Sequence, residues 1–125
     1  LANVDLKSLL EFHKKHGKIA TVTAVRPVSR FGVMDVSSNG SVEQFREKPQ
    51  ADGWINAGFF VFNKEIFDYL DENSILENEP MALLAEKNQL MAFNHEGFFQ
   101  PMDTYREFTL LNDLWDLGNA PWKVW

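Results

Sequence analysis

The chain has 125 residues, enough for one domain or part of one, and 45% of them are hydrophobic and can fill a core. The net charge of −6 argues against a nucleic-acid partner, because phosphate backbones bind basic surfaces. This net charge does not exclude the binding of one small phosphate by local cations. There is no Cys, which excludes disulfides and fits a reducing, cytoplasmic compartment. Apolar runs such as AGFFVF are far shorter than the roughly 20 residues that span a bilayer, so we expect no membrane span.

Residues 3–17 predict an amphipathic helix at the start of the chain. Asn3 can cap it, and Gly17 follows a basic last turn and ends it. One face follows the helical spacing i, i+3, i+4, i+7 and consists of Leu6, Leu9, Leu10 and His13. Residues 18–25 are rich in small and β-branched side chains, which predicts a strand buried on both faces.

The next two extended runs, residues 31–38 and 41–48, lie on either side of Asn39-Gly40. A two-residue Asn-Gly turn between extended runs is the strongest short-range signal of a β-hairpin, so we predict that hairpin. Because it lies between two core strands along the chain, we expect it to project from the sheet as a small flap.

The remaining sequence continues the alternation of strands and helices. Residues 54–63 predict a second apolar strand, at the centre of the sheet. The other expected elements are helices at 64–71, 79–88 and 104–118, with one or two short strands within 90–101. Residues 1–125 therefore read as a single partial domain of the α/β class, with a mixed sheet and a projecting β-hairpin.

Glu47 and Lys48 end the second strand of the predicted hairpin and stand directly before Pro49. Pro49 favours extended geometry for Lys48, so the two charged side chains should face opposite ways unless the strand bends. One interpretation is an ordinary charged strand end. The other is a grip on an anion, because a Lys at a pocket rim is a good phosphate ligand.

Asp103 stands one residue outside the last predicted helix. Thr104 and Glu107 form a capping box, S/T-x-x-E, so Thr104 is the expected cap and the Asp103 carboxylate stays free. That carboxylate has either a structural role or a role in binding Mg²⁺ beside substrate phosphates.

Three further residues are candidates for a ligand pocket. Gly32 either serves the turn before the hairpin or lets a ligand approach the backbone. Asn56 and Gly58 lie inside an apolar run, where a buried Asn needs hydrogen-bond partners and a Gly marks close approach by backbone or ligand. The three His residues are scattered without the spacing of a zinc site.

Five segments, in this order and spacing, resemble the sugar-phosphate nucleotidylyltransferases. They are RFG at 30–32, FREKP at 45–49, INAGFFVFN at 55–63, GFFQPMDTYRE at 97–107 and APWKVW at 120–125. The likeness is greatest to the glucose-1-phosphate cytidylyltransferases and covers the C-terminal half of such an enzyme. It implies a Rossmann-like α/β/α fold and transfer of a nucleotidyl group from a nucleoside triphosphate to a sugar 1-phosphate. The base stays open between cytidylyl, thymidylyl and uridylyl, although QPMDT and APWKVW favour cytidylyl.

The resemblance also implies roles for individual residues. Lys48 would bind the sugar phosphate, and Glu47 would hydrogen-bond to sugar hydroxyls. Gly32 would line the sugar pocket, and Asn56 and Gly58 would lie on the strand beneath it. Asp103 would be one of two aspartates that hold Mg²⁺. Ala57 departs from the pattern, where a second glycine is expected.

Other parts of the family's site are missing from this sequence. The glycine-rich loop that holds the triphosphate, its companion lysine and the second metal-binding aspartate are absent. We therefore expect that this sequence is part of a longer chain. It should keep the half of the site that binds the sugar phosphate, and should not catalyse nucleotidyl transfer by itself. The alternative is a stand-alone, non-catalytic module that binds a sugar phosphate or oligomerises. An open sheet edge favours a homo-oligomer, and Trp122 and Trp125 can dock on the core or on a neighbour.

Overall fold

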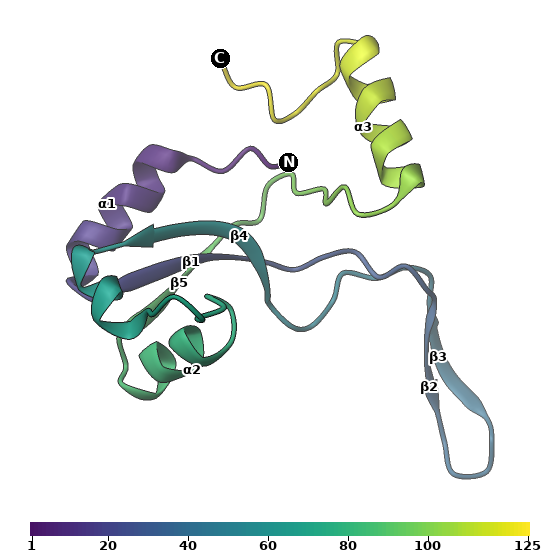
Figure 1. The fold of residues 1–125 in the computed structure, drawn as a ribbon. Helices are drawn as coiled ribbons and strands as arrows, with labels where there is room; N and C mark the ends of the chain where they lie inside the picture. Colours follow the sequence, from purple (N-terminus) through teal and green to yellow (C-terminus); the bar gives the residue numbers. More distant parts are fainter.

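The computed structural model describes residues 1–125 as a small α/β body with a hairpin arm and a C-terminal helix beside it (Figure 1). The helices are α1 (Leu6–His16), η1 (Lys64–Tyr69, a 3₁₀ helix), α2 (Glu79–Glu86) and α3 (Tyr105–Asp116). The strands are β1 (Ala20–Val25), β2 (Val33–Val36), β3 (Val42–Arg46), β4 (Ile55–Phe62) and β5 (Leu90–Asn94). None of the helices is long and apolar enough to cross a membrane.

The body is built on a three-stranded mixed sheet with the order β4-β1-β5. β1 runs antiparallel to β4 and parallel to β5, so the mixed sheet is confirmed. The expectation that residues 54–63 form the central strand is wrong. β1 lies at the centre because its residues are small enough to be covered on both faces, whereas β4 is paired on one side only and Ile55 stays exposed.

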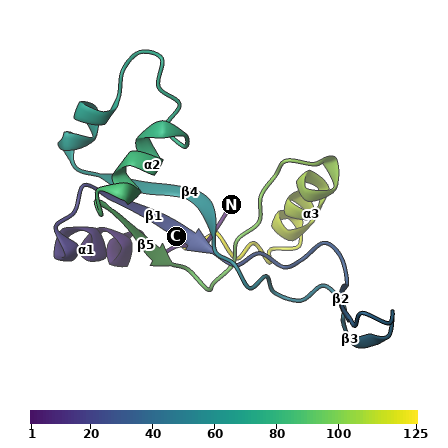
Figure 2. The ribbon, with the colours of Figure 1, turned by 90° about the horizontal axis from the view of Figure 1, so that it is seen from below.

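Helices cover both faces of this sheet, with α1 on one face and η1 and α2 on the other (Figure 2). On the second face Ala20, Ile66 and Leu84 form the buried core. On the first face Phe12 of α1 packs against Phe93 of β5, with ring centroids 5.6 Å apart. The alternation of side chains along β1 thus separates two thin cores.

The first helix begins later than expected. Its N-cap is Asp5, whose Oδ1 accepts hydrogen bonds from the backbone N–H groups of Lys7 and Ser8, both at 3.0 Å. The Ser8 hydrogen bond also lowers the pKa of Asp5. Asn3 is drawn away from the helix because its backbone N–H donates to the Phe98 carbonyl, 3.2 Å away. The cap predicted at Asn3 is therefore wrong by two residues.

The predicted hairpin is confirmed, but its turn is longer than two residues. The Gly40 N–H donates to the Ser37 carbonyl and the Ser37 N–H to the Ser41 carbonyl, both at 2.9 Å. Only Gly40 is left-handed, with φ of 87°, and the Asn39 side chain accepts from the Ser41 N–H instead. This is a three-residue loop with a glycine bulge. All residues of β2 and β3 are exposed, and the hairpin stands away from the body (Figure 1).

The other predicted elements are present with shifted ends. The helix predicted at 64–71 is η1, and those predicted at 79–88 and 104–118 are α2 and α3. The stretch 90–101 forms the single strand β5, after which Phe99 makes only an isolated bridge with Ala2. Thr104 caps α3 with the full capping box.

The tail after α3 returns to the body through one tryptophan. Trp122 is buried against Phe98, with ring centroids 5.7 Å apart, whereas Trp125 is 81% exposed. Only 14 of 125 residues are buried, and large apolar side chains of the hairpin and of α3 face solvent. The chain therefore holds much apolar surface that it does not cover itself.

Two histidines join α1 to the sheet through a closed hydrogen-bond circuit. The Lys18 N–H donates to His16 Nδ1 (2.9 Å), so Nε2 of His16 carries the proton and donates to Thr21 Oγ1 (2.6 Å). The Thr21 hydroxyl can then donate to His13 Nδ1 (2.8 Å), and His13 Nε2–H to Asn63 Oδ1 (2.9 Å). Asn63 Nδ2 donates to the Lys18 carbonyl (3.2 Å), which closes the circuit. Every donor meets an acceptor only when both imidazoles are neutral.

This circuit predicts a loss of stability in mild acid. Burial, followed by the charges of His13 and Lys18, lowers the pKa of His16 below the ordinary 6.5. As the pH falls through that ordinary value the unfolded chain binds a proton before the folded chain does, so the unfolding free energy decreases. It should stop decreasing once the pH falls below the folded pKa. Urea unfolding at steps between pH 7.5 and 5.5 measures this.

The matched variants are His16→Gln, which keeps a donor for Thr21 but does not titrate, and Lys15→Gln on the same helical turn. His16→Gln should flatten the dependence of the unfolding free energy on pH over this range, and Lys15→Gln should keep it. An unchanged pH dependence in His16→Gln would contradict the assignment.

Candidate functional site

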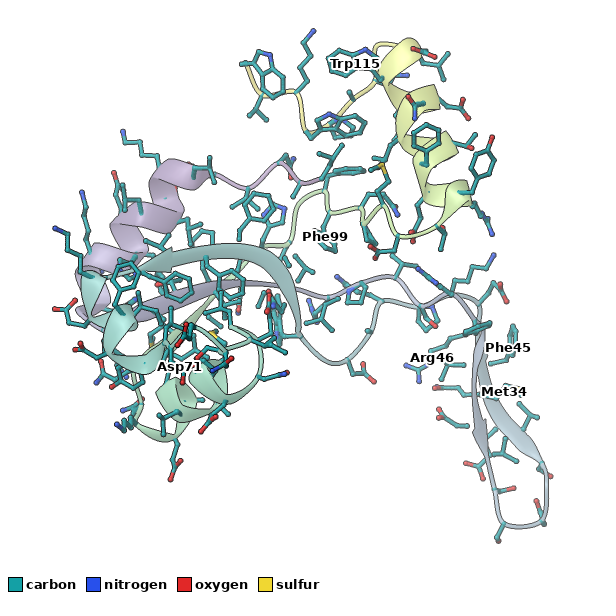
Figure 3. All side chains as sticks on the ribbon, viewed as in Figure 1. Met34, Phe45, Arg46, Asp71, Phe99 and Trp115 are labelled. Atoms are coloured by element: carbon teal, nitrogen blue, oxygen red, sulfur yellow. The ribbon has the colours of Figure 1, made fainter.

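A cleft with a volume of about 920 Å³ lies between the hairpin arm and the start of α3. Its walls come from three parts of the chain. The hairpin arm, which consists of β2, β3 and the segments on either side of them, contributes residues 27, 28, 30, 31 and 48. The start of β4 contributes residues 55 and 56, and the third wall is the segment 99–110. Figure 3 shows Phe99, one of the lining residues, between the sheet and α3. The cleft thus depends on tertiary structure rather than on one local motif.

Three of the six residues singled out from the sequence line the cleft together. They are Lys48, Asn56 and Asp103, from three separate segments. The other three, Gly32, Glu47 and Gly58, lie outside its lining. A concave surface with a few convergent polar groups is the usual form of a small-molecule site.

Lys48 does not adopt the extended geometry predicted for it. Its φ is +44°, a left-handed conformation that costs a non-glycine residue about 1–2 kcal/mol. Pro49 disfavours the right-handed helical region for Lys48. The chain therefore bends here, and the Ser29 N–H donates to the Pro49 carbonyl at 2.8 Å. As a result Lys48 Nζ lies 3.8 Å from Glu47 Oε1, so both charges can address one ligand.

Gly32 acts within the arm. A Cβ at this position would lie 2.9 Å from Phe45 Cζ and 3.2 Å from Glu47 Oε2. The missing side chain lets the Phe45 ring lie across the arm and leaves room for the Glu47 carboxylate. The structure therefore gives Gly32 a packing role next to Glu47.

Asn56 is exposed, so the expectation of a buried Asn is wrong. Its Oδ1 accepts a hydrogen bond from the Gly58 N–H at 2.7 Å, and Gly58 has φ of +78°. Val22 pairs with Phe60 and Ala24 with Asn56, so residues 57–59 bulge opposite Thr23. The Asn-Ala-Gly signal marks a β-bulge, which re-aims the strand where it reaches the cleft.

Glu107 links the arm to α3 and was not among the residues selected from the sequence. Its Oε1 lies 2.8 Å from Arg30 Nη2, and its Oε2 accepts from the N–H groups of Asp103 (2.9 Å) and Thr104 (3.0 Å). The Asp103 backbone hydrogen bond, with those of Thr104 and the charge of Arg30, lowers the pKa of Glu107 although burial opposes this. The capping box signalled the Thr104 contacts, but no local pattern signalled Arg30, 77 residues away.

The Asp103 carboxylate is exposed and accepts no hydrogen bond, as expected from the Thr104 cap. Both oxygens of Glu107 are already used, so Asp103 is the one free carboxylate in the cleft. No group of three His, Asp or Glu side chains that could hold a metal ion exists in the chain. Mg²⁺ is usually held by one or two carboxylates together with substrate phosphates, so Asp103 supplies one ligand at most, and its role as a magnesium ligand stays a prediction.

The charges of the cleft suit a small anion. Three cations, Arg30, Lys48 and Arg106, face two carboxylates, Asp103 and Glu107. Arg106 was also missed in the sequence, where it stood inside the capping box without any distinguishing pattern.

Comparison with known proteins agrees with the α/β fold. A model of the nucleotidyl transferase family matches residues 1–120. A glucose-1-phosphate cytidylyltransferase of Salmonella typhi is 49% identical over 100% of this chain and 49% of its own length. A mannose-1-phosphate guanyltransferase of Saccharomyces cerevisiae is 32% identical over 86% of this chain and 32% of its own.

A solved structure, HddC from Yersinia pseudotuberculosis, matches the fold with a TM-score of 0.60 at 20% identity, over 91% of this chain and 51% of that one. The chain therefore spans about half the length of the cytidylyltransferase that it matches. Since the family model covers nearly all of the sequence, this chain belongs to the nucleotidyl transferase family.

Proposed function

We propose that this chain forms the sugar-phosphate-binding half of a glucose-1-phosphate cytidylyltransferase, which makes CDP-glucose and pyrophosphate from CTP and glucose 1-phosphate. The observation that carries the proposal is the cleft in which Lys48, Asn56 and Asp103 meet. The 49% identity to the Salmonella typhi enzyme supports the substrate. In this proposal the chain is the C-terminal half of a Rossmann-like α/β/α fold.

The geometry suits the positioning of one substrate. In the proposed reaction an oxygen of the sugar phosphate attacks the α-phosphorus of CTP, and the bond to the β-phosphate oxygen breaks. Two anions must be brought together, so a cation on the sugar phosphate lowers their repulsion. Lys48 is that cation, and Glu47, 3.8 Å from it, is suited to accept hydrogen bonds from sugar hydroxyls. Asn56 on the wall of the cleft offers an amide to the same ligand.

Lys48→Ala tests the substrate site. Titration calorimetry of the wild-type chain should detect glucose 1-phosphate, and the substitution should weaken its affinity about tenfold, because a charge-assisted contact is lost. Lys14→Ala, on the exposed face of α1, is the matched control and should bind as the wild type does. Binding that is unchanged by Lys48→Ala would remove Lys48 from the site.

The isolated chain should form no CDP-glucose. The proposed half-site holds one of the two substrates, and the sequence contains no glycine-rich loop for a triphosphate. The chain is incubated with CTP, glucose 1-phosphate and Mg²⁺, and nucleotide sugars are separated by chromatography, with the Salmonella typhi enzyme as positive control. CDP-glucose at any rate above the uncatalysed background would refute the half-site proposal.

The alternative, a stand-alone module that binds a sugar phosphate or oligomerises, is favoured by one observation. Met34 pairs with Phe45 and Val36 with Val42, so all four lie on one face of the hairpin, and each is more than half exposed. Asp35 and Arg46 lie on the other face, and Figure 3 shows Phe45 and Arg46 on opposite sides. An isolated two-stranded hairpin is marginal in water, so this face needs a cover.

We expect a homo-oligomer for this reason. Sedimentation velocity at micromolar concentration should show a species larger than 14.4 kDa. Met34→Ser, on the apolar face, should shift it toward the monomer, and Gln44→Ser, on the polar face, should not. A wild-type monomer at these concentrations would count against the expectation.

A further inference from the structure

The three cations of the cleft differ in what they are free to do. Arg30 is bound to Glu107, with 2.8 Å between Nη2 and Oε1, and the Glu107 side chain is only 12% exposed. The charge of Arg30 is therefore balanced, and breaking the pair would leave a nearly buried carboxylate uncompensated. Arg30 is best understood as a structural cation of the cleft wall.

Lys48 is only loosely paired. Its Nζ lies 3.8 Å from Glu47 Oε1, and both side chains are more than half exposed, so water screens the pair. A ligand phosphate can take the place of that contact at little cost. Lys48 alone, however, supplies one positive charge against the double charge of a sugar phosphate.

Arg106 is the third cation, and it has no partner. It makes no ion pair and its guanidinium donates no hydrogen bond, although it lines the same cleft as Lys48. Its backbone is held in the first turn of α3 by the capping box of Thr104 and Glu107 on either side of it. A guanidinium is a planar fork that matches two phosphate oxygens, which an ammonium group cannot do.

We propose that Arg106 binds the phosphate of the sugar phosphate together with Lys48, while Arg30 only holds the wall of the cleft. Within the cleft lining three cations face two carboxylates, so the lining carries a net positive charge that favours a dianion. The inference rests on the proposed function for the identity of the sugar phosphate. It assigns Arg106 to the site as a second residue that binds the phosphate, beside Lys48, and leaves Arg30 a structural role.

The test compares Arg106→Gln and Arg106→Lys with Arg46→Gln, a cation of the hairpin outside the cleft lining. Calorimetry with glucose 1-phosphate and, separately, inorganic phosphate gives the affinities. Arg106→Gln should weaken both about tenfold, Arg106→Lys less, and Arg46→Gln not at all. The loss in Arg106→Gln should be larger at pH 7.5 than at pH 5.0, because the second pKa of a phosphate monoester is about 6. A merely structural role would give no such pH dependence. Thermal unfolding of each variant checks that it is folded.

The outcomes separate this inference from the proposed function. If the wild type binds glucose 1-phosphate and Arg106→Gln binds it equally well, the role of Arg106 is refuted and the proposed function stands. If inorganic phosphate binds through Arg106 but glucose 1-phosphate binds no more tightly, the anion site stands and the proposed function is refuted. If neither ligand binds the wild type, both are refuted.

Discussion

The Glu107 carboxylate is the contact on which the site depends. One oxygen meets Arg30 of the hairpin arm, and the other accepts two backbone N–H groups at the start of α3. Glu107 and Leu111 are the only buried residues of α3, so little else holds this helix against the chain. Hydrogen bonds to a shielded charge are stronger than those between neutral groups, and losing one partner is costly. Without this carboxylate the cleft would lose the join between two of its walls.

The same contact decides which side chains are left for chemistry. Because Glu107 balances Arg30, the free positive charge of the cleft falls to Lys48 and Arg106. Lys48 reaches the cleft only through a left-handed backbone before Pro49, and such strain is concentrated at functional sites. The bulge at Asn56 and Gly58 brings the end of β4 to the same place. Two of the three walls are thus oriented by an irregularity of the backbone.

The chain leaves much of its apolar surface uncovered. The body is stabilised by two thin cores and by the circuit through His13, Thr21 and His16, while the hairpin and α3 present apolar side chains to solvent. A chain that spans about half the length of its cytidylyltransferase relative has less core available to bury such surface. That imbalance favours association.

Local signals in the sequence determined the hairpin at Asn39-Gly40, the helix ending at Gly17 and the capping box at Thr104, because turn geometry and capping act over a few residues. The ordered motifs also determined the family. Only the tertiary structure decided that Asp5 rather than Asn3 caps α1, that β1 rather than β4 is central, and that Asn56 is exposed. Sheet order and burial depend on which segments compete for the same partner. Arg30 and Glu107 are paired although 77 residues separate them, and no sequence pattern predicts a contact over that separation. Because Glu107 pairs with Arg30, the neighbouring Arg106 is left without an ion-pair partner.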